Sequence, residues 1–279
     1  MKGTFMLYLV STPIGNLGDI SDRAKEVLKS VDLVACEDTR TSGQLFSLLG
    51  IKVAATIPYH EHNANQMRPK LLEKLRHNVN IALVSDAGTP LISDPGYKLV
   101  RDCYDMGIPV TTIPGANAVL SALQLSGLPS NAFYFAGFLS PKSGARQKAL
   151  RELKDIHATL IIYEAPNRLL EMLADIRDIL GNRLMAVVRE ITKKFEEVKR
   201  DTVSNLIAHY NKSGLPKGEL VLVIGEATEE KAFNAAKVDT LIQKNLKSHT
   251  PRDTAEIVAE ITGLSKKQIY KRVVELNAK

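Results

Sequence analysis

The chain has 279 residues, of which 44% are hydrophobic and 24% charged, a composition typical of a globular protein. At about 100–200 residues per domain, this length predicts two domains with room for a small third one. No run of about 18 apolar residues occurs, which argues against a transmembrane helix, and the apolar run Phe5–Val10 is too short for the core of a signal peptide. Cys36 and Cys103 are too few for a disulfide framework, so we expect a cytoplasmic protein.

Positive charge is concentrated near the C-terminal end. Residues 231–279 hold ten Lys and Arg against five Asp and Glu, which accounts for +5 of the formal net charge of +6. The first 230 residues hold the other 27 basic and 26 acidic residues and are therefore almost neutral. A basic tail on a near-neutral body fits a polyanionic partner. A solvated, lysine-rich helical surface explains the same charge.

The first half of the chain alternates short apolar runs with amphipathic stretches. The predicted strands are Phe5–Val10, Leu33–Cys36, Val53–Ile57, Ile81–Val84 and Val110–Ile113. The predicted helices are Ser21–Ser30, Ser42–Leu49, Gln66–His77, Tyr97–Met106 and Asn117–Leu125. Strands that alternate with helices favour a mostly parallel sheet covered on both faces. We therefore predict a first α/β domain over residues 1–126.

After a cluster of turn-forming residues at Ser126–Asn131, the alternation resumes. The predicted strands are Phe133–Phe138, Leu160–Tyr163, Leu184–Val188 and Leu220–Ile224, and the predicted helices are Gln147–Ile156, Leu169–Leu180 and Val203–Tyr210. Glu196–Thr202 alternates in a way that allows an antiparallel strand. This pattern predicts a second α/β domain with a mixed sheet over residues 127–228.

The tail, residues 229–279, contains no predicted strand. Its apolar spacing predicts three short helices, Val238–Leu246, Thr254–Ile261 and Lys266–Leu276. Ala259–Ile269 has the spacing of a helix-turn-helix, with Gly263 in the turn. Three-helix modules of this kind bind nucleic acid in some proteins and serve only as packing or dimerisation elements in others.

Polar or glycine-rich loops follow the predicted strands of the first domain, and ligands of open α/β sheets bind at the carboxyl ends of strands. Ser11–Asp19 matches neither the dinucleotide fingerprint nor the P-loop. Glu37–Arg40 is charged, and His60–Asn63 has too few ligands for a metal site. Ser85–Gly96 has four Gly or Pro residues among twelve, which favours a rigid binding loop, and Pro114–Ala118 begins a helix with small residues.

The order of these loops resembles the tetrapyrrole methylase superfamily of S-adenosylmethionine-dependent methyltransferases, and within it a subfamily of ribosomal RNA 2′-O-methyltransferases. Val84–Gly96, VSDAGTPLISDPG, is the most specific match, and the helical tail is similar to the extra module of this subfamily. Asn167 stands where the family usually has His, which argues against histidine-based proton transfer at that loop. The matching stretches are Thr12–Ile20, Glu37–Arg40, His60–Asn63, Val84–Gly96, Pro114–Ala118, Tyr163–Arg168 and Arg189–Glu197.

The resemblance implies that S-adenosylmethionine binds in a cleft between the two α/β domains, without a metal. Small residues in the loops agree with this, because they let backbone groups approach a ligand closely. The implied cofactor contacts are Pro13, Asp86, Ala87, Gly88, Thr89, Ile92, Asn117, Ala118, Tyr163 and Ala186.

The implied reaction is methylation of a cytidine ribose 2′-hydroxyl in the decoding region of small-subunit ribosomal RNA. A hydroxyl is a poor nucleophile, so a base or a nearby cation must assist loss of its proton. Each charged candidate has an alternative role in an ion pair within the protein, and the sequence does not single out one base. The candidate proton acceptors are Glu37, Asp38, Glu164 and Glu190, and the candidate cations are Arg40, Arg168 and Lys193.

The implied partner is small-subunit ribosomal RNA or the small ribosomal subunit, bound through phosphate contacts by a homodimer of the chain. Two other functions compete with this one. A tetrapyrrole carbon methyltransferase would use the same fold but would not need a basic tail. A non-enzymatic nucleic-acid-binding regulator would be built around the helix-turn-helix, with the α/β body as a ligand sensor. The candidate RNA contacts are Lys142, Arg146, Lys266, Lys267, Lys271 and Arg272.

Overall fold

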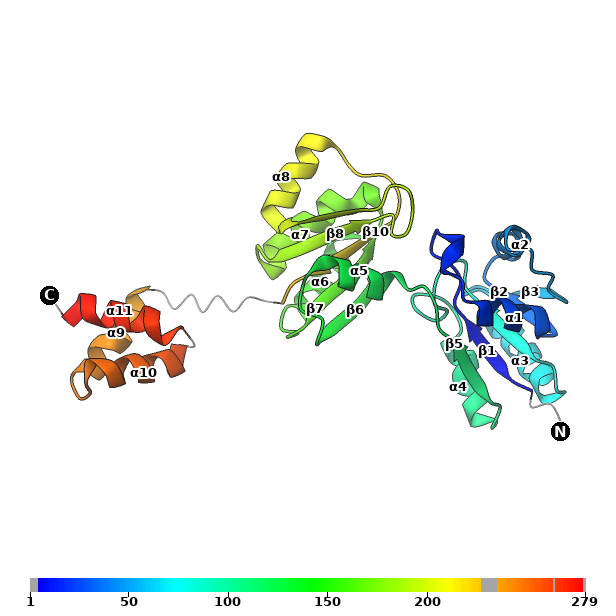
Figure 1. Ribbon diagram of the computed structural model, residues 1–279, viewed down its shortest axis with the longest axis horizontal. Helices are drawn as coiled ribbons and strands as arrows, with labels where there is room; N and C mark the ends of the chain where they lie inside the picture. The colour runs from blue at the N-terminus through cyan, green and yellow to red at the C-terminus, as the bar shows by residue number, and fades with distance from the viewer. Residues whose placement is uncertain (1–4, 227–234, 263, 278–279) are drawn as a thin grey trace. The chain divides into compact units, whose positions relative to one another are not determined.

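The computed structural model describes residues 5–226, 235–262 and 264–277. They belong to two compact units, residues 1–226 and residues 227–279. Figure 1 shows two separate sheets with their helices in the larger unit and a group of helices in the smaller unit. Within the described ranges, no helix has the length and hydrophobicity needed to cross a bilayer.

The first sheet is entirely parallel, as the alternation of strands and helices predicts. Its strand order is β3-β2-β4-β1-β5, and every pair of neighbours runs in the same direction. β3 is shorter and begins later than predicted, because Val53 packs into the core beside the sheet instead of pairing with β2. The strands are β1 (Leu7–Val10), β2 (Leu33–Cys36), β3 (Thr56–Pro58), β4 (Ile81–Val84) and β5 (Val110–Ile113).

Helices cover both faces of this sheet. Apolar side chains of α1 and α2 pack on one face, and those of α3 and α4 pack on the other. α2 begins three residues before the predicted start, because the Asp38 carboxylate caps it by accepting the Arg40 backbone N–H at 2.8 Å. The helices are α1 (Asp22–Ser30), α2 (Thr39–Leu48), α3 (Ala64–Arg76) and α4 (Tyr97–Asp105).

The second sheet is mixed, as predicted. Its order is β6-β7-β10-β8-β9; β6 and β7 are parallel, and the remaining neighbours are antiparallel. One face is covered by α6 (Ser143–Leu153), α7 (Leu169–Leu180) and α8 (Val203–Ser213). The strands are β6 (Phe133–Phe138), β7 (Thr159–Glu164), β8 (Leu184–Arg189), β9 (Glu197–Thr202) and β10 (Leu220–Ile224).

α5 (Ala118–Ser126) covers the other face of the second sheet. Its buried residues Val119, Ala122 and Leu123 pack with side chains of β7, β8 and β10. The sequence prediction grouped this helix with the first domain, residues 1–126, whereas in the structure its apolar side belongs to the core of the second sheet. The chain therefore passes from one sheet to the other through the loop that follows β5.

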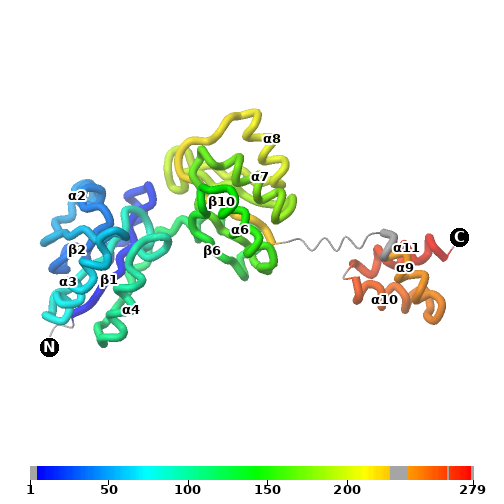
Figure 2. The backbone as a smooth tube through the Cα atoms, turned by 180° about the vertical axis from the view of Figure 1, so that it is seen from behind, coloured from blue at the N-terminus to red at the C-terminus, as the bar shows by residue number. Residues whose placement is uncertain are grey.

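The smaller unit contains α9 (Ala235–Leu246), α10 (Pro251–Thr262) and α11 (Lys266–Asn277), which pack together in both views (Figures 1 and 2). Its core includes Ile242, Ala255, Val258 and Val273. The three predicted tail helices are thus present. Gly263 of the predicted turn and the predicted domain boundary at 228/229 lie outside the described residues.

Candidate functional site

A cavity of about 440 Å³ lies within the larger unit, where the loops after β1, β2, β4 and β5 meet the second sheet. Its size falls in the range of about 300–1,000 Å³ typical of small-molecule sites. From the first half of the unit it is lined by Ile14, Glu37, Asp86, Ala87, Ile92, Ser93, Asp94 and Ala118. From the second half it is lined by Phe138, Tyr163, Glu164, Ala165, Pro166, Gly218, Glu219, Leu220 and Val221.

The loop Ser85–Gly96 is fixed to its neighbours by backbone hydrogen bonds. The Thr12 N–H donates to the Gly88 carbonyl at 2.9 Å, and the Gly88 N–H donates to the Thr12 carbonyl at 3.1 Å. The Thr89 hydroxyl donates to the Ala116 carbonyl at 3.1 Å, which joins this loop to the start of α5. Gly88 has φ +85°, and a Cβ there would lie 3.1 Å from a methyl carbon of Ile14, so this position requires glycine.

Carboxyl groups form the first-sheet wall of the cavity. The Asp38 backbone N–H donates to an Asp86 oxygen at 3.0 Å, which connects the loops after β2 and β4. Burial, reinforced by the Asp86 charge, raises the pKa of Glu37. Burial and the charges of Glu37 and Asp86 raise the pKa of Asp94 to about 6. Among the described residues, none of the three lining carboxylates of this wall, Glu37, Asp86 and Asp94, forms an ion pair with Lys or Arg.

Aromatic rings support the opposite wall. The Tyr163 ring lies 4.9 Å from the Phe135 ring and 5.2 Å from the Phe138 ring, measured between centroids. Burial, followed by the charges of Asp94 and Glu219, raises the pKa of Tyr163 to about 12. The phenol therefore stays protonated at neutral pH, and the ring offers an apolar surface to a ligand.

Glu164, at the end of β7, lines the cavity and holds a buried oxygen without a hydrogen-bond partner. Its Oε1 accepts hydrogen bonds from the Arg168 Nε at 2.6 Å and from the Ala165 N–H at 2.7 Å. Its Oε2 is buried without a hydrogen-bond partner, and the side chain is 0% exposed. An unsatisfied buried carboxylate oxygen costs about 1–3 kcal/mol or more. A ligand that donates a hydrogen bond here would remove that cost.

The charged loop after β8 supports the cavity from behind. The Lys193 ammonium lies 3.0 Å from a Glu190 oxygen and 2.9 Å from a Glu219 oxygen, so it links this loop to a lining residue. The Lys193 stem also packs on Gly15 of the loop after β1, where a Cβ would overlap it. The Lys193 stem therefore packs the second half of the larger unit against the first, while its ion pairs with Glu190 and Glu219 lie within the second half.

The predicted cofactor contacts divide into two groups. Asp86, Ala87, Ile92, Ala118 and Tyr163 line the cavity. The others are not among the lining residues: Pro13, Gly88 and Thr89 lie in or beside the hydrogen-bonded loops, Asn117 caps α5, and Ala186 lies in β8, buried in the core between the second sheet and α5.

The predicted catalytic residues also divide, and most of them are ion-paired. Glu37 and Glu164 line the cavity. Among the described residues, Glu37 is the one candidate outside any ion pair; the other six form the pairs Asp38–Arg40, Glu164–Arg168 and Glu190–Lys193. Pairing with Arg40 lowers the pKa of Asp38 to about 2, which makes it a weak base.

Sequence reasoning missed several lining residues. Asp94 lies inside the specific Val84–Gly96 match but was not selected, because its burial is visible only in the fold. Gly218–Val221 lie at the start of β10. β10 runs antiparallel to both β7 and β8, so its beginning lies beside their carboxyl ends. A search of loops after strands cannot find such residues.

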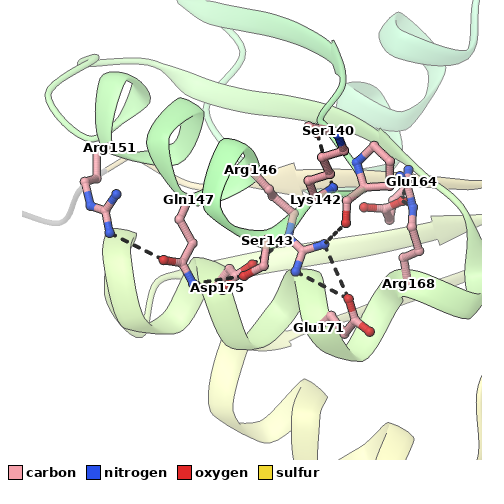
Figure 3. A network of polar contacts seen from close by, with 11 residues as sticks. Ser140, Lys142, Ser143, Arg146, Gln147, Arg151, Glu164, Arg168, Glu171 and Asp175 are labelled. Carbon is pink, nitrogen blue, oxygen red and sulfur yellow. Dashed lines mark hydrogen bonds and ion pairs between the residues drawn. The ribbon is translucent and has the colours of Figure 1, made fainter.

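Two candidate RNA contacts, Lys142 and Arg146, lie around the N-terminus of α6, and only one is exposed. Lys142 is exposed at the N-cap position. Arg146 is 2% exposed, and its Nε donates to Asp175 of α7 at 2.5 Å (Figure 3). Glu171 and the Pro141 carbonyl take its remaining donors. Arg146 is therefore not available to a phosphate, and we correct its assignment: it joins α6 to α7.

The basic residues of the smaller unit differ in whether they form ion pairs within the protein. Arg272 pairs with Asp239 at 2.6 Å and with Glu275 at 3.0 Å, which raises its pKa and ties α11 to α9. Lys266 pairs with Glu256, and Lys271 is exposed. An open hollow of about 550 Å³ is lined by Arg252, Lys266, Lys267 and Tyr270.

Among the described residues, no group of three or more His, Cys, Asp or Glu side chains is arranged to hold a metal ion. His60 and His62 lie edge to face, with ring centroids 6.1 Å apart.

The chain matches two known protein families. Residues 6–207 match the family of Tetrapyrrole (Corrin/Porphyrin) Methylases, and residues 233–277 match the RsmI C-terminal HTH domain. The chain belongs to the tetrapyrrole methylase family.

Two similar relatives carry the name ribosomal RNA small subunit methyltransferase I. The one from Mesorhizobium japonicum is 48% identical over 97% of this chain and 92% of its own length. The one from Escherichia coli O157:H7 is 45% identical over 96% of this chain and 94% of its own length. Among solved structures, uroporphyrin-III C-methyl transferase from Thermus thermophilus complexed with S-adenosyl homocysteine has a TM-score of 0.53 at 19% identity, covering 80% of this chain and 98% of that chain. This last likeness concerns the fold alone.

Proposed function

We propose that the chain is a cytoplasmic, S-adenosylmethionine-dependent methyltransferase that methylates the ribose 2′-oxygen of a cytidine in the decoding region of small-subunit ribosomal RNA. The observation that carries the proposal is the match to ribosomal RNA small subunit methyltransferase I over nearly the full length of chain and relative. Both the two-sheet unit and the helical module take part in that match.

S-adenosylmethionine fits the cavity by chemistry as well as by size. The walls offer apolar side chains for its adenine and methylene groups, including Ile14, Ala118, Tyr163 and Val221. Glu164 Oε2 is a buried acceptor without a partner, which suits a ribose hydroxyl or an amino group of the cofactor. The carboxylates of the first-sheet wall favour a positively charged ligand. Asp86 and Ala87 would contact the cofactor from the Ser85–Gly96 loop.

The bound cofactor supplies a methyl carbon attached to a positively charged sulfur, and transfer requires the accepting oxygen to lie in line with that bond. The protein therefore contributes mainly alignment and exclusion of water. The Thr12–Gly88 bridge and the Thr89–Ala116 bond hold the loops rigid, so a ligand seated against Ala87 has one orientation. Lys193, through Glu219 and Gly15, keeps the opposite wall in place.

Ribosomal RNA would contact the cavity mouth and the helical module. Lys142 is exposed beside α6, and the hollow on the module combines Arg252 and Lys267 with Tyr270, whose side chain is 46% exposed. Cations beside an exposed aromatic ring suit an unpaired nucleotide, because the ring stacks on a base while the cations hold phosphate. Lys266, which also lines the hollow, and Lys271 add positive charge, whereas Arg272 is ion-paired with Asp239 and Glu275.

A homodimer fits the exposed apolar side chains of the second sheet. Phe133 and Tyr134 are 43% and 45% exposed on β6, which is an edge strand, and Leu120 and Leu125 are exposed on α5. Such residues at a sheet edge favour association. Sedimentation equilibrium of the chain and of a Phe133→Lys variant tests this: we expect a dimer that the substitution weakens, and a monomer at all concentrations would contradict it.

The decisive experiment compares ribosomal RNA from cells with and without the protein, using mass spectrometry to map ribose methylation. We expect one cytidine of the decoding region to lose its 2′-O-methyl group and to regain it when small subunits are incubated with protein and labelled cofactor. A precorrin-type macrocycle serves as the competing substrate, and label in the macrocycle alone would reject the proposal. Duplex DNA binding without methyl turnover would favour the regulator.

A truncation before Lys231 separates the roles of the two units. Because the cavity is built wholly from the larger unit, we expect cofactor binding to survive and RNA methylation to weaken. Tyr270→Ala in the full chain is expected to weaken RNA binding in the same direction, while Lys29→Ala, an exposed cation of α1, serves as the control. Loss of cofactor binding on truncation would contradict this modular arrangement.

A further inference from the structure

Transfer to a hydroxyl requires a proton acceptor, and the cavity offers few. Among the described residues that line it, the titratable side chains are five carboxylates and the phenol of Tyr163. Tyr163 is unsuitable, because its pKa near 12 keeps the proton on the phenol. The five carboxylates are those of Glu37, Asp86, Asp94, Glu164 and Glu219.

Two of these carboxylates are neutralised by cations. Glu164 is ion-paired with Arg168 and also accepts the Ala165 N–H. Glu219 is ion-paired with Lys193. Both carboxylates are therefore engaged by cations of the protein itself.

Three carboxylates remain, and two of them already accept backbone donors. Asp86 accepts the Asp38 N–H at 3.0 Å, and Glu37 accepts a hydrogen bond from the Asp86 backbone. Both side chains are therefore already engaged by the backbone of a neighbouring loop. Within the described part of the chain, Asp94 has the Ser85 side chain as its one hydrogen-bond partner, and it lines the same cavity as Tyr163.

We propose that Asp94 is the general base that accepts the proton of the substrate hydroxyl, with Glu37 as the positioning residue whose negative charge strengthens it. The assignment rests on the proposed function and names a residue for its central step. The proton passes from the hydroxyl to an Asp94 oxygen while the hydroxyl oxygen bonds to the methyl carbon. The carbon–sulfur bond breaks, and its electron pair stays on sulfur.

The balance of charge supports this assignment. Before transfer, the partly buried cavity holds a cationic sulfur and an ionised Asp94; afterwards, both are neutral. No new charge is created in a desolvated place, where uncompensated charge is costly. Burial together with the charges of Glu37 and Asp86 raises the pKa of Asp94 to about 6, which makes it a stronger base than an ordinary aspartate and leaves it ionised at pH 7.

The surroundings of Asp94 predict the pH profile. Glu37, Asp86, Ser85 and Tyr163 face it, and His60 faces Glu37. Tyr163 does not titrate below about pH 10 in this setting, so the acid limb of the rate belongs to the coupled pair Asp94 and Glu37. Single-turnover methyl transfer at saturating cofactor is therefore expected to fall below about pH 6.

The test compares variants of the full chain acting on small ribosomal subunits. Asp94→Asn is expected to lower the transfer rate about 10²–10⁴-fold and to leave the calorimetric affinity for S-adenosylhomocysteine unchanged within about threefold, a difference of only about 0.65 kcal/mol. Asp94→Glu, which restores a carboxylate, should recover part of the rate. Glu37→Gln should move the acid limb to lower pH, and Asp22→Asn on exposed α1 controls for loss of negative charge.

Three results would overturn the assignment. They are an Asp94→Asn rate close to that of the unaltered chain, an unchanged acid limb in that variant, and loss of S-adenosylhomocysteine binding, which would make Asp94 a cofactor contact. Failure of the proposed function is distinguishable, because the unaltered chain would then transfer no methyl group to ribosomal RNA.

Discussion

Arg146 is predicted to be a structural residue, and replacing it tests the packing of the second sheet. Its side chain is 3% exposed, and its main partner Asp175 is 11% exposed, so their ion pair lies in the core between α6 and α7 (Figure 3). Arg146→Met keeps most of the volume and removes the charge. Asp175 would then remain buried with Gln147, whose amide donates at 2.9 Å, as its one remaining side-chain donor among the described residues.

The expected loss follows from this geometry. Breaking a buried ion pair by removing one partner costs about 3–5 kcal/mol, and the remaining Gln147 bond places the cost near the low end. Glu171 is 68% exposed, so its share is about 1 kcal/mol or less. For a unit of this size, a loss of about 3 kcal/mol lowers the melting temperature by roughly 6–12 °C.

Thermal unfolding followed by far-ultraviolet circular dichroism measures this loss in the full chain. Glu171→Gln is the matched control and should shift the melting temperature by no more than a few degrees. Arg146→Met combined with Asp175→Leu should recover most of the stability, because an apolar pair of similar volume replaces the buried charges. Comparison of the two variants distinguishes the buried Arg146–Asp175 ion pair from the contact of Arg146 with the exposed Glu171.

Two results would refute this reasoning. One is an Arg146→Met variant as stable as the unaltered chain, and the other is equal destabilisation by Arg146→Met and Glu171→Gln. If, in addition, Arg146→Met weakened RNA binding at temperatures well below melting, the original interpretation of Arg146 as an RNA contact would regain support.

Three further predictions concern the cavity. Gly88→Leu should weaken cofactor binding more than tenfold by calorimetry, because φ +85° and the nearby Ile14 exclude a side chain; Gly43→Ala on α2, which meets no atom within 4 Å, should leave it unchanged. Glu164→Gln should weaken cofactor binding about tenfold, or 1.4 kcal/mol, and unchanged affinity would show that Oε2 does not contact the ligand. Asp94→Asn should stabilise the chain at pH 7–8 by about 1–2 kcal/mol, since burial raises the pKa of Asp94 from 3.8 to about 6 and solvent screens part of that cost. This gain should shrink as the pH falls from 6 and vanish below about pH 4 in urea titrations; a gain independent of pH would contradict it.

The strands of both sheets were predictable because each is a short run of apolar or β-branched residues bounded by polar turns. β2 and β4 are buried along their whole length, as expected for central strands of a parallel sheet. β9 was recognisable from its alternation despite its charges, because one of its edges is open. Local pattern therefore identified the strands, the mostly parallel first sheet and the mixed second sheet, but not the direction of β10.

The position of α5 was not predictable by the same means. Its sequence, AVLSALQLS, is apolar or small on nearly every side, so periodicity does not indicate which sheet it covers. Val119 and Leu123 pack on the second sheet, while Leu120 and Leu125 remain exposed. The path of the chain after β5 determines which of the two sheets α5 covers, and that path is visible only in the tertiary structure.

The candidate site was predictable in location but not in the roles of its charges. The carboxyl ends of β1, β2, β4 and β5 do meet at one cavity, as the loop order indicates. Sequence spacing, however, gives no measure of burial or pairing. Asp38 and Glu190 looked equivalent to Glu37 as bases, but in the fold they pair with Arg40 and Lys193, and Glu190 also accepts the Glu219 backbone N–H at 3.0 Å.

The same argument explains why Asp94 was overlooked while the loop that carries it was recognised. A carboxylate becomes a strong base through what it lacks, namely a cation and backbone donors, and such a lack has no sequence motif. Asp86 belongs to the same loop as Asp94, whereas Glu37 follows β2, and its charge acts on Asp94 because β2 and β4 are neighbours in the sheet. The order of the strands thus contributes to the raised pKa of Asp94, because it brings a second carboxylate close to it.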